Sequence, residues 1–280
     1  MLRFATGPFR KTAAETRAEW QPLVRYIGQQ LELDTQLTVC DSWDGLADAI
    51  TQGDCDAAWM GGGFRYVQAR ARGAGPAIAT VASAGSPWCH AIVVGARHIA
   101  SHAFRFPRDA RGLSLAFTHD QSTTGWLMVY AALAAQGIKP ESYFRYSACN
   151  QHADNELDVA SGRCDLATDS ESNRSAMVQR GLVKEADVPV VWRSEPLPQD
   201  PIAVSARMPA ALAARLQRVL ADIGTSDQHS CQMPAGYSGF AVACDDSYSA
   251  IRAAARLVGR LPLASVPGQG EEVPPLSSHV

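Results

Sequence analysis

The segment Leu37 to Ala57, LTVCDSWDGLADAITQGDCDA, decides the fold, because its design is repeated once further along the chain. It contains a short strand that ends at a cysteine, a polar turn, a helical stretch and a Gly-x-Cys-Asp step into a second strand. Residues 146–166, YSACNQHADNELDVASGRCDL, follow the same order. A strand, a helix and a strand in this order form a parallel βαβ unit. Two units of one design predict two similar α/β lobes.

The rest of the chain alternates short β-branched runs with helical stretches, which is the pattern of an α/β fold. The expected strands are residues 2–5, 36–40, 57–60, 77–81, 90–95, 114–117, 143–147, 164–168, 188–192 and 202–205. The expected helices are residues 13–31, 43–53, 62–72, 123–136, 152–161, 171–181 and 208–223. The second of these is well marked, with Ser42 as its N-cap and Gly53 at its end.

The composition narrows the classes of protein. With 280 residues, 46% hydrophobic and 19% charged, the chain is long enough and apolar enough to bury a core. A net charge of −3 with scattered arginines gives no surface for nucleic acid. The longest apolar run, Trp126 to Ala135, is about half the ~20 residues of a membrane-spanning helix. We therefore expect a globular protein that contacts neither nucleic acid nor the inside of a bilayer.

The N-terminal sequence and the cysteines give information on the cellular compartment of the protein, and the C-terminal sequence on its order. A strand follows Met1 directly and lacks the features of a signal peptide, so the chain is either cytosolic or has lost a signal. Seven cysteines without CxxC spacing predict neither a zinc site nor a full disulfide framework. We expect no metal and no other cofactor. Residues 266–280, rich in Pro, Gly, Ser and Glu, are expected to form a disordered tail.

The strongest chemical signal is a loop of hydroxyl side chains between a strand and an apolar helix. Ser122, Thr123 and Thr124 lie where that helix begins. Free N–H groups, the positive end of the helix and hydroxyl donors together suit a bound oxyanion. With no Lys or Arg beside the loop in the sequence, we expect a small, dehydrated anion. The alternative interpretation is an ordinary helix cap.

Four other side chains lie at strand ends or in turns. His152 and Asp200 each follow a strand or precede one, and with Ser122 they could form a Ser-His-Asp triad. No G-x-S-x-G elbow surrounds the serine, which argues against that triad. Trp43 and Trp88 lie in turns and are interpreted either as core residues or as walls of a ligand pocket.

A glycine run, Gly61 to Gly63, follows one expected strand and precedes a helix. Glycines in such a place allow the backbone to approach a ligand closely. The run is not a G-x-G-x-x-G motif, so it predicts no dinucleotide site.

Several motifs, taken in order, resemble the phosphonate/phosphite-binding proteins of ABC importers. The resemblance extends over residues 2–255 and is carried by Trp20-Gln21-Pro22-Leu23, Ser122-Thr123-Thr124-Gly125 and Pro198-Gln199-Asp200-Pro201. It implies a type II periplasmic-binding-protein fold, in which two α/β lobes joined by two crossovers close on a ligand in the cleft between them. The crossovers are expected near residues 94–110 and 198–203.

The resemblance also implies roles for single residues. The family's anion-holding loop corresponds to Ser122, Thr123 and Thr124, its ligand-binding histidine to His152, and its Pro-x-Asp-Pro carboxylate to Asp200.

The aromatic positions of the family differ in this chain. One cleft tyrosine of the family corresponds to Trp43, and a second corresponds to Trp88 or, with a shift of one residue, to Cys89. Both changes make the pocket more apolar, which suits a ligand with P–H or P–CH3 groups. The carboxylate that holds an amino group in some relatives corresponds to Asp169 or Glu171.

These observations predict a non-enzymatic solute-binding component of an ABC importer for phosphite, hypophosphite or a small alkylphosphonate. Its partners would be that anion and an inner-membrane permease. We expect a monomer, periplasmic if a signal peptide has been removed and otherwise cytoplasmic. The rival interpretations are a cytosolic ligand sensor or enzyme of the same fold, and a hydrolase that uses Ser122, His152 and Asp200.

The expected division of the chain follows the same resemblance. Residues 1–96 would form the first part of lobe 1 and residues 97–199 lobe 2. Residues 200–265 would return to lobe 1 and add C-terminal helices to it, ahead of the tail.

Overall fold

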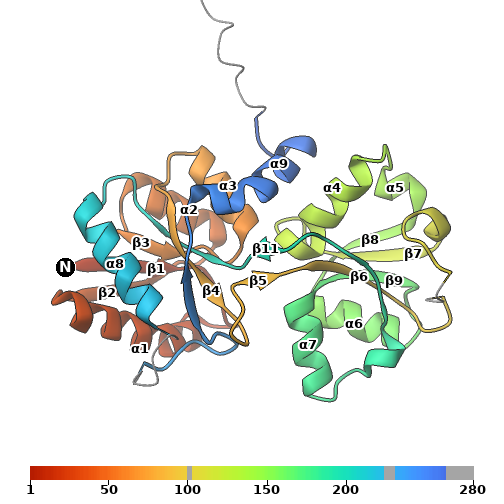
Figure 1. Cartoon of the computed structure of the whole chain (residues 1–280), viewed down its shortest axis with the longest axis horizontal. Coiled ribbons are helices and arrows are strands. Elements are labelled where there is room, and N and C mark those ends of the chain that lie inside the picture. Colours follow the sequence, from red (N-terminus) through yellow and green to blue (C-terminus); the bar gives the residue numbers. More distant parts are fainter. Residues whose placement is uncertain (100–102, 224–230, 263–280) are drawn as a thin grey trace, which may run out of the picture.

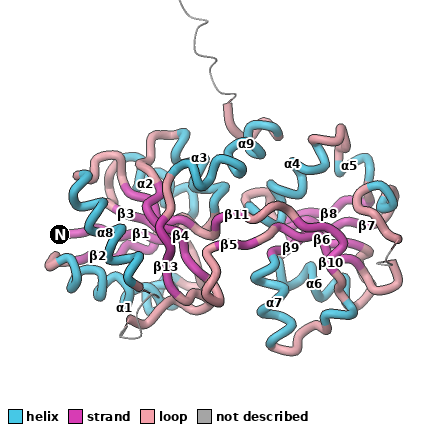
Figure 2. Tube along the Cα trace, viewed as in Figure 1, coloured by secondary structure: helices cyan, strands magenta, loops and turns pink. Residues whose placement is uncertain are grey.

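The computed structural model describes residues 1–99, 103–223 and 231–262, and it has two lobes, each built around a β-sheet (Figure 1). Figure 2 shows the strands of each lobe flanked by helices. The two-lobed α/β fold expected from the sequence is confirmed. The expected tail, residues 266–280, lies outside the described residues.

The first lobe holds a six-stranded sheet in the order β13-β4-β12-β3-β1-β2. Its strands are β1 (Leu2–Thr6), β2 (Thr35–Val39), β3 (Ala57–Trp59), β4 (Ala77–Ala82), β12 (Pro201–Val204) and β13 (Gly239–Val242). Its helices are α1 (Ala13–Leu31), α2 (Trp43–Gln52), α3 (Gly63–Ala71) and α8 (Ala210–Asp222). Helices α1 and α8 pack together on one face of the sheet, and α2 and α3 on the other.

Side chains of alternate residues on each strand divide between those two faces, as the two-residue period of a strand requires. Phe4 packs in the core under α1 and α8, whereas Ala5, the next residue, packs in the core under α2 and α3. In β3, Trp59 joins the first core and Ala58 the second. Both faces of the central strands are buried, which explains why β3, β4 and β12 are almost entirely apolar.

The second lobe holds a five-stranded sheet in the order β10-β6-β9-β7-β8. Its strands are β6 (Ala91–Gly95), β7 (Ser114–Thr118), β8 (Arg145–Asn150), β9 (Leu166–Ser170) and β10 (Val190–Arg193). Its helical segments are η1 (Arg108–Ala110), η2 (Thr123–Leu127), α4 (Met128–Ala134), α5 (Pro140–Tyr143), α6 (His152–Ala160), α7 (Glu171–Gln179) and η3 (Glu185–Asp187).

The internal repeat is confirmed as two equivalent units. In the first lobe, β1 lies between β2 and β3, with α2 connecting those two strands. In the second lobe, β7 lies between β8 and β9, with α6 connecting them. Trp43 is the first residue of α2 and His152 the first residue of α6, so the two occupy equivalent positions in the two lobes.

The crossovers between the lobes lie at two short paired strands, β5 (Trp88–Cys89) and β11 (Leu197–Pro198). Figure 1 shows both between the lobes. The first crossover therefore precedes the boundary expected at residue 96, because β6 is hydrogen-bonded into the second sheet. A strand that is buried on both faces has the same apolar sequence pattern in either lobe. The pattern of β6 therefore did not show to which sheet it belongs.

The C-terminal helix α9 (Ser249–Leu257) follows the short turn η4 (Asp245–Tyr248) and packs against α3 of the first lobe and α4 of the second. Beyond it, Arg260 forms an ion pair with Asp120, which precedes the hydroxyl loop, at 2.8 Å. The segment after β13 thus contacts both lobes. No helix within the described ranges is long and apolar enough to cross a membrane.

Candidate functional site

The candidate site lies where the carboxyl ends of the parallel strands of the two sheets meet, the edge at which ligands bind in open α/β sheets. Strand β7 ends at Thr118, and Ser122 then caps η2, which continues directly into α4. The Ser122 Oγ accepts the N–H of Gly125 at 3.0 Å. The N–H groups of Thr123 and Thr124 lie in the first turn of the helix, where no carbonyl of an earlier helical residue can accept them. They are therefore available to an anion.

Gly125 lets this loop fold tightly. The first turn of the helix is π-helical, with the N–H of Leu127 donating to the Ser122 carbonyl at 3.0 Å. A Cβ on Gly125 would lie 2.2 Å from Thr118 Oγ1 and 2.8 Å from His152 Cε1. Only glycine fits at this position, and it keeps His152 close to the loop.

His152 connects the hydroxyl loop to a buried carboxylate. Its Nε2 lies 3.2 Å from Ser122 Oγ, and its Nδ1 lies 2.5 Å from Asp169 Oδ1. Asp169 is fully buried and also accepts hydrogen bonds from the Asn173 side chain at 2.8 Å and the Ser170 N–H at 2.6 Å. The carboxylate therefore fixes the orientation of the imidazole.

Glu156, on α6, is also fully buried. Burial and, after it, the neighbouring charge of Asp169 raise the pKa of Glu156 to about 9. At neutral pH Glu156 is therefore protonated.

On the first lobe, Trp43 lies against backbone that only glycine allows. A Cβ on Gly61 would lie 2.2 Å from Trp43 Cη2, and a Cβ on Gly7 would lie 2.3 Å from Cε3. The Arg65 guanidinium lies 4.2 Å from the centroid of the Trp43 ring, in a cation–π contact. The indole is therefore held in one orientation by its neighbours.

Arg65, on α3, brings a basic side chain near the hydroxyl loop, although no Lys or Arg lies beside that loop in the sequence. Its Nη1 donates to the Gly61 carbonyl at 2.8 Å. Burial lowers the pKa of Arg65 to about 10, while the charge of Asp200 opposes this shift, so the guanidinium remains cationic at neutral pH. The sequence around the loop did not reveal it because Arg65 comes from the other lobe.

The two lobes meet at Thr123. Its Oγ1 accepts the N–H of Phe64, in the first turn of α3, at 3.0 Å. A Cβ added to Gly62 would lie 3.3 Å from Thr123 Oγ1 and 3.8 Å from Arg65 Nη1. The amino ends of α3 and η2 therefore converge here, and the positive ends of both helices favour a negative charge.

Asp200 lies just ahead of β12, which is antiparallel to β3, so it reaches the same edge of the sheet. Its Oδ2 accepts the hydroxyl of Tyr237 at 2.9 Å. Burial raises the pKa of Asp200, whereas the bond from Tyr237 and the charge of Arg65 act in the opposite direction.

The triad interpretation must be corrected in one member. Asp169, not Asp200, is the carboxylate bonded to His152 in the described part of the chain. Asp169 lies on β9. The resemblance to the family pointed to the end of this strand but did not decide between Asp169 and Glu171.

Trp88 does not join the other predicted residues. Its side chain is 52% exposed, because neighbouring residues of β5 point to opposite faces. Cys89 points the other way, and burial, with the charges of Asp200 and Glu171, raises the pKa of its thiol to about 12. Cys89, the one-residue alternative, is thus the residue of β5 whose side chain is affected by the charge of Asp200.

Glu171 is already paired. One of its carboxylate oxygens lies 2.7 Å from Arg193 Nη2, and the other lies 3.8 Å from His90 Nε2. Because Asp169 lies buried behind His152, neither acidic residue presents an unpaired carboxylate.

Sequence reasoning proposed the hydroxyl loop, His152, Asp200 and Trp43 as site residues but did not include three of their neighbours. Arg65 had one usable signal, its place just after the glycine run at a helix start. Glu156 and Tyr237 had none, since a buried Glu on a helix and a tyrosine in a distant loop reveal their contacts only in three dimensions.

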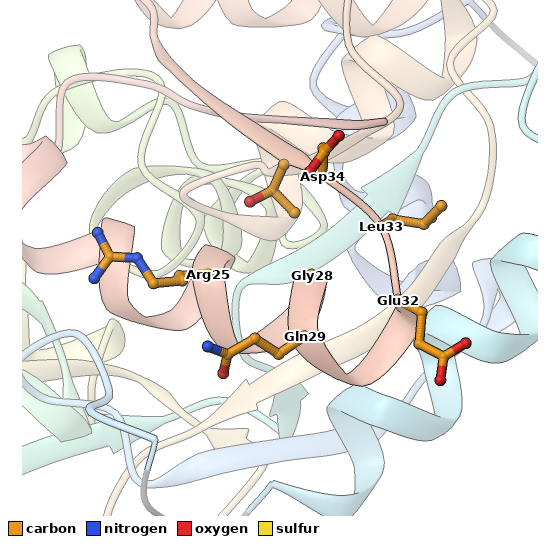
Figure 3. A pocket seen from close by; sticks show the side chains of 7 residues that line it. Arg25, Gly28, Gln29, Glu32, Leu33 and Asp34 are labelled. Carbon is orange, nitrogen blue, oxygen red and sulfur yellow. The ribbon is translucent and has the colours of Figure 1, made fainter.

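A surface hollow lies elsewhere on the first lobe (Figure 3). It is lined by Arg25, Gly28, Gln29, Glu32, Leu33, Asp34 and Thr35. These residues end α1 and lead into β2, so the hollow borders the sheet edge opposite the candidate site.

The chain is similar to known proteins in sequence and in fold. A family model described as "ABC transporter, phosphonate, periplasmic substrate-binding protein" matches residues 9–248. The phosphonates-binding periplasmic protein of Escherichia coli K12 is 23% identical over 188 residues, which cover 66% of this chain and 55% of that protein. The chain therefore aligns with about half the length of that curated relative.

Two solved structures share the fold. PhnD1 from Prochlorococcus marinus, in complex with methylphosphonate, has a TM-score of 0.72 and 15% identity, and the match covers 93% of this chain and 98% of that one. XAC2383 from Xanthomonas citri, bound to ATP, has a TM-score of 0.74 and 17% identity, with 92% and 98% covered.

Proposed function

Because the chain belongs to the family of periplasmic substrate-binding proteins of phosphonate ABC transporters, we propose that it binds a small phosphorus oxyanion, without covalent chemistry, between its lobes. One observation carries the proposal: anion-binding groups from both lobes converge at Thr123. The hydroxyl loop and His152 come from the second lobe, and Arg65 and the start of α3 come from the first. An anion held by both lobes favours their closed arrangement.

The surrounding side chains favour phosphite, hypophosphite or a small alkylphosphonate. The Trp43 indole offers an apolar surface to a P–H or P–CH3 group. Asp200, whose pKa is raised, can share a proton with a P–OH group. Glu171 is engaged by Arg193, so an amino group would have to displace that ion pair, which disfavours 2-aminoethylphosphonate.

In this proposal the paired strands β5 and β11 are the hinge. They are the crossovers that connect the sheets, and they pair over only two residues in each strand. Rotation about them would separate the Phe64 N–H from Thr123 and admit the ligand. The closed form would then dock on an ABC permease, and the protein would act in the periplasm.

Replacement of Ser122 tests the hydroxyl loop. Ser122→Ala removes one donor to a charged ligand, so we expect the Kd for phosphite or methylphosphonate to rise about ten- to hundredfold. Ser122→Asp keeps a good helix cap but places a negative charge beside the anion, and should weaken binding further. Isothermal titration calorimetry measures both effects.

Ser142→Ala is the matched control, because Ser142 is an exposed serine of the same lobe whose hydroxyl donates to the Lys139 carbonyl. It should bind like the unaltered protein. Equal affinities for Ser122→Asp and the unaltered protein would place the anion elsewhere.

The Ser122–His152–Asp169 chain of hydrogen bonds favours one rival, a hydrolase. We expect a serine-directed phosphonylating reagent to leave Ser122 unlabelled, because this hydroxyl already caps the helix through Gly125. Mass spectrometry of the treated protein decides the matter. Stoichiometric labelling that Ser122→Ala abolishes would favour the hydrolase.

A further inference from the structure

We infer that Arg65 is the charge partner of the ligand and makes the site prefer dianionic tetrahedral phosphorus ligands, such as phosphite and alkylphosphonates, over monoanionic hypophosphite. This inference rests on the proposed function. It adds a residue from the first lobe that no sequence motif assigned to the site.

The first observation is a half-buried cation that has no ion-pair partner among the described residues. Within the described ranges Arg65 forms no ion pair, whereas Arg3, Arg10, Arg70 and Arg72 of the same lobe each pair with a carboxylate. The Nε of Arg65 is buried and has no hydrogen-bond acceptor among the residues that the structure describes. Burying a charged group without a partner is costly, so an anion that supplies the missing acceptor is bound favourably.

The second observation is the direction in which the guanidinium acts. Its Nη1 and Thr123 Oγ1 flank the same point beside Gly62, 3.8 Å and 3.3 Å away. Its charge also reaches His119, at the start of the hydroxyl loop, where burial and then Arg65 lower the pKa of the imidazole. The charge of Arg65 therefore acts on the loop that would hold the anion.

The third observation is the preorganisation of the side chain. Stacking on Trp43 and the bond to the Gly61 carbonyl fix the plane of the guanidinium. A fixed planar fork of N–H donors matches the geometry of two oxygens on one phosphorus atom. The entropic cost of ordering the side chain is already met before the ligand binds.

The ligand's charge then decides the preference. Hypophosphite has one ionisable proton, so it carries one negative charge at any pH above its pKa. Phosphite and methylphosphonate have two ionisable protons and are largely dianionic at pH 8. The attraction to Arg65 grows with the charge on the anion, and Asp200 opposes it less when that carboxyl holds a proton.

The test compares phosphite and hypophosphite by titration calorimetry at pH 8. The unaltered protein should bind phosphite more tightly. In Arg65→Gln, the Kd for phosphite should rise about ten- to hundredfold and the Kd for hypophosphite much less, so that the preference falls about tenfold or more. Arg65→Lys keeps the charge without the fork and should retain part of the preference.

Two controls separate binding from folding. Arg72→Gln makes the same change on an exposed arginine at the far end of α3 and should leave both affinities unchanged. Without ligand, Arg65→Gln should unfold at the same temperature as the unaltered protein or a higher one, because it removes a half-buried charge that has no ion-pair partner in the described part of the chain. If Arg65→Gln does not fold, Arg65→Lys still reports the preference.

The outcomes are distinguishable. If the unaltered protein binds neither anion, the proposed function itself fails. If it binds them but Arg65→Gln keeps the same preference, or loses both anions equally, then Arg65 does not select by charge and the inference is overturned.

Discussion

Gly125→Ala is expected to lower the affinity for phosphite or methylphosphonate more than hundredfold while leaving the protein folded. The added Cβ would stand 2.2 Å from Thr118 Oγ1, 2.5 Å from Thr118 Cγ2 and 2.8 Å from His152 Cε1. These atoms must move apart, which displaces the imidazole from Ser122 and opens the π-helical turn. Overpacking of this kind costs about 1–3 kcal/mol of stability. Calorimetry and urea unfolding measure the two effects.

The control for this substitution is Gly162→Ala, in the same lobe. Gly162 has a φ of +73° and nothing within 4 Å of the added Cβ. It should cost about 1–2 kcal/mol through its left-handed backbone and leave affinity unchanged. Binding by Gly125→Ala at the original affinity would mean that this loop does not hold the ligand.

Glu156→Gln is expected to stabilise the protein increasingly as the pH rises. The unfolded chain releases the Glu156 proton near pH 4.5, whereas the folded protein keeps it until about pH 9. Between these values the folded state binds more protons than the unfolded state, so the free energy of unfolding falls as the pH rises. The glutamine cannot ionise and removes that loss.

The expected difference between Glu156→Gln and the unaltered protein is small near pH 5. It grows to the order of 5 kcal/mol near pH 9, at about 1.4 kcal/mol per pH unit. Urea unfolding at pH 6, 7, 8 and 9 measures it. Glu195→Gln, at an exposed position, should run parallel to the unaltered protein. A difference for Glu156→Gln that does not vary with pH would show that Glu156 is ionised in the folded state.

Most of the fold could be predicted from local patterns. The repeated βαβ unit predicted the two lobes, and helices such as 13–31 were placed at the observed bounds because their caps and apolar faces are encoded locally. Strand β13 was missed because it is short, and α9 was covered only by the general expectation of C-terminal helices within residues 200–265, because it lies in a stretch rich in alanine and arginine.

The sequence predicted only those site residues that lie in a single recognisable loop or at the end of a recognisable strand. Ser122 and His152 lie at helix starts next to apolar strands, where polar residues are conspicuous. Arg65 and Tyr237 reach the site from segments distant in the sequence. Trp88 was placed in the pocket by analogy, whereas the alternation of β5 turns Cys89 inward instead.

The most direct test of the account is thermal unfolding of the full chain with hypophosphite, phosphite, methylphosphonate, 2-aminoethylphosphonate, phosphate and ATP, with sulfate as the control. A ligand at 100 times its Kd should add about 2.7 kcal/mol to the free energy of unfolding. The account predicts a large upward shift with phosphite or methylphosphonate and none with sulfate. If none of the phosphorus anions shifts the transition, the account of this site as an anion-binding site is contradicted.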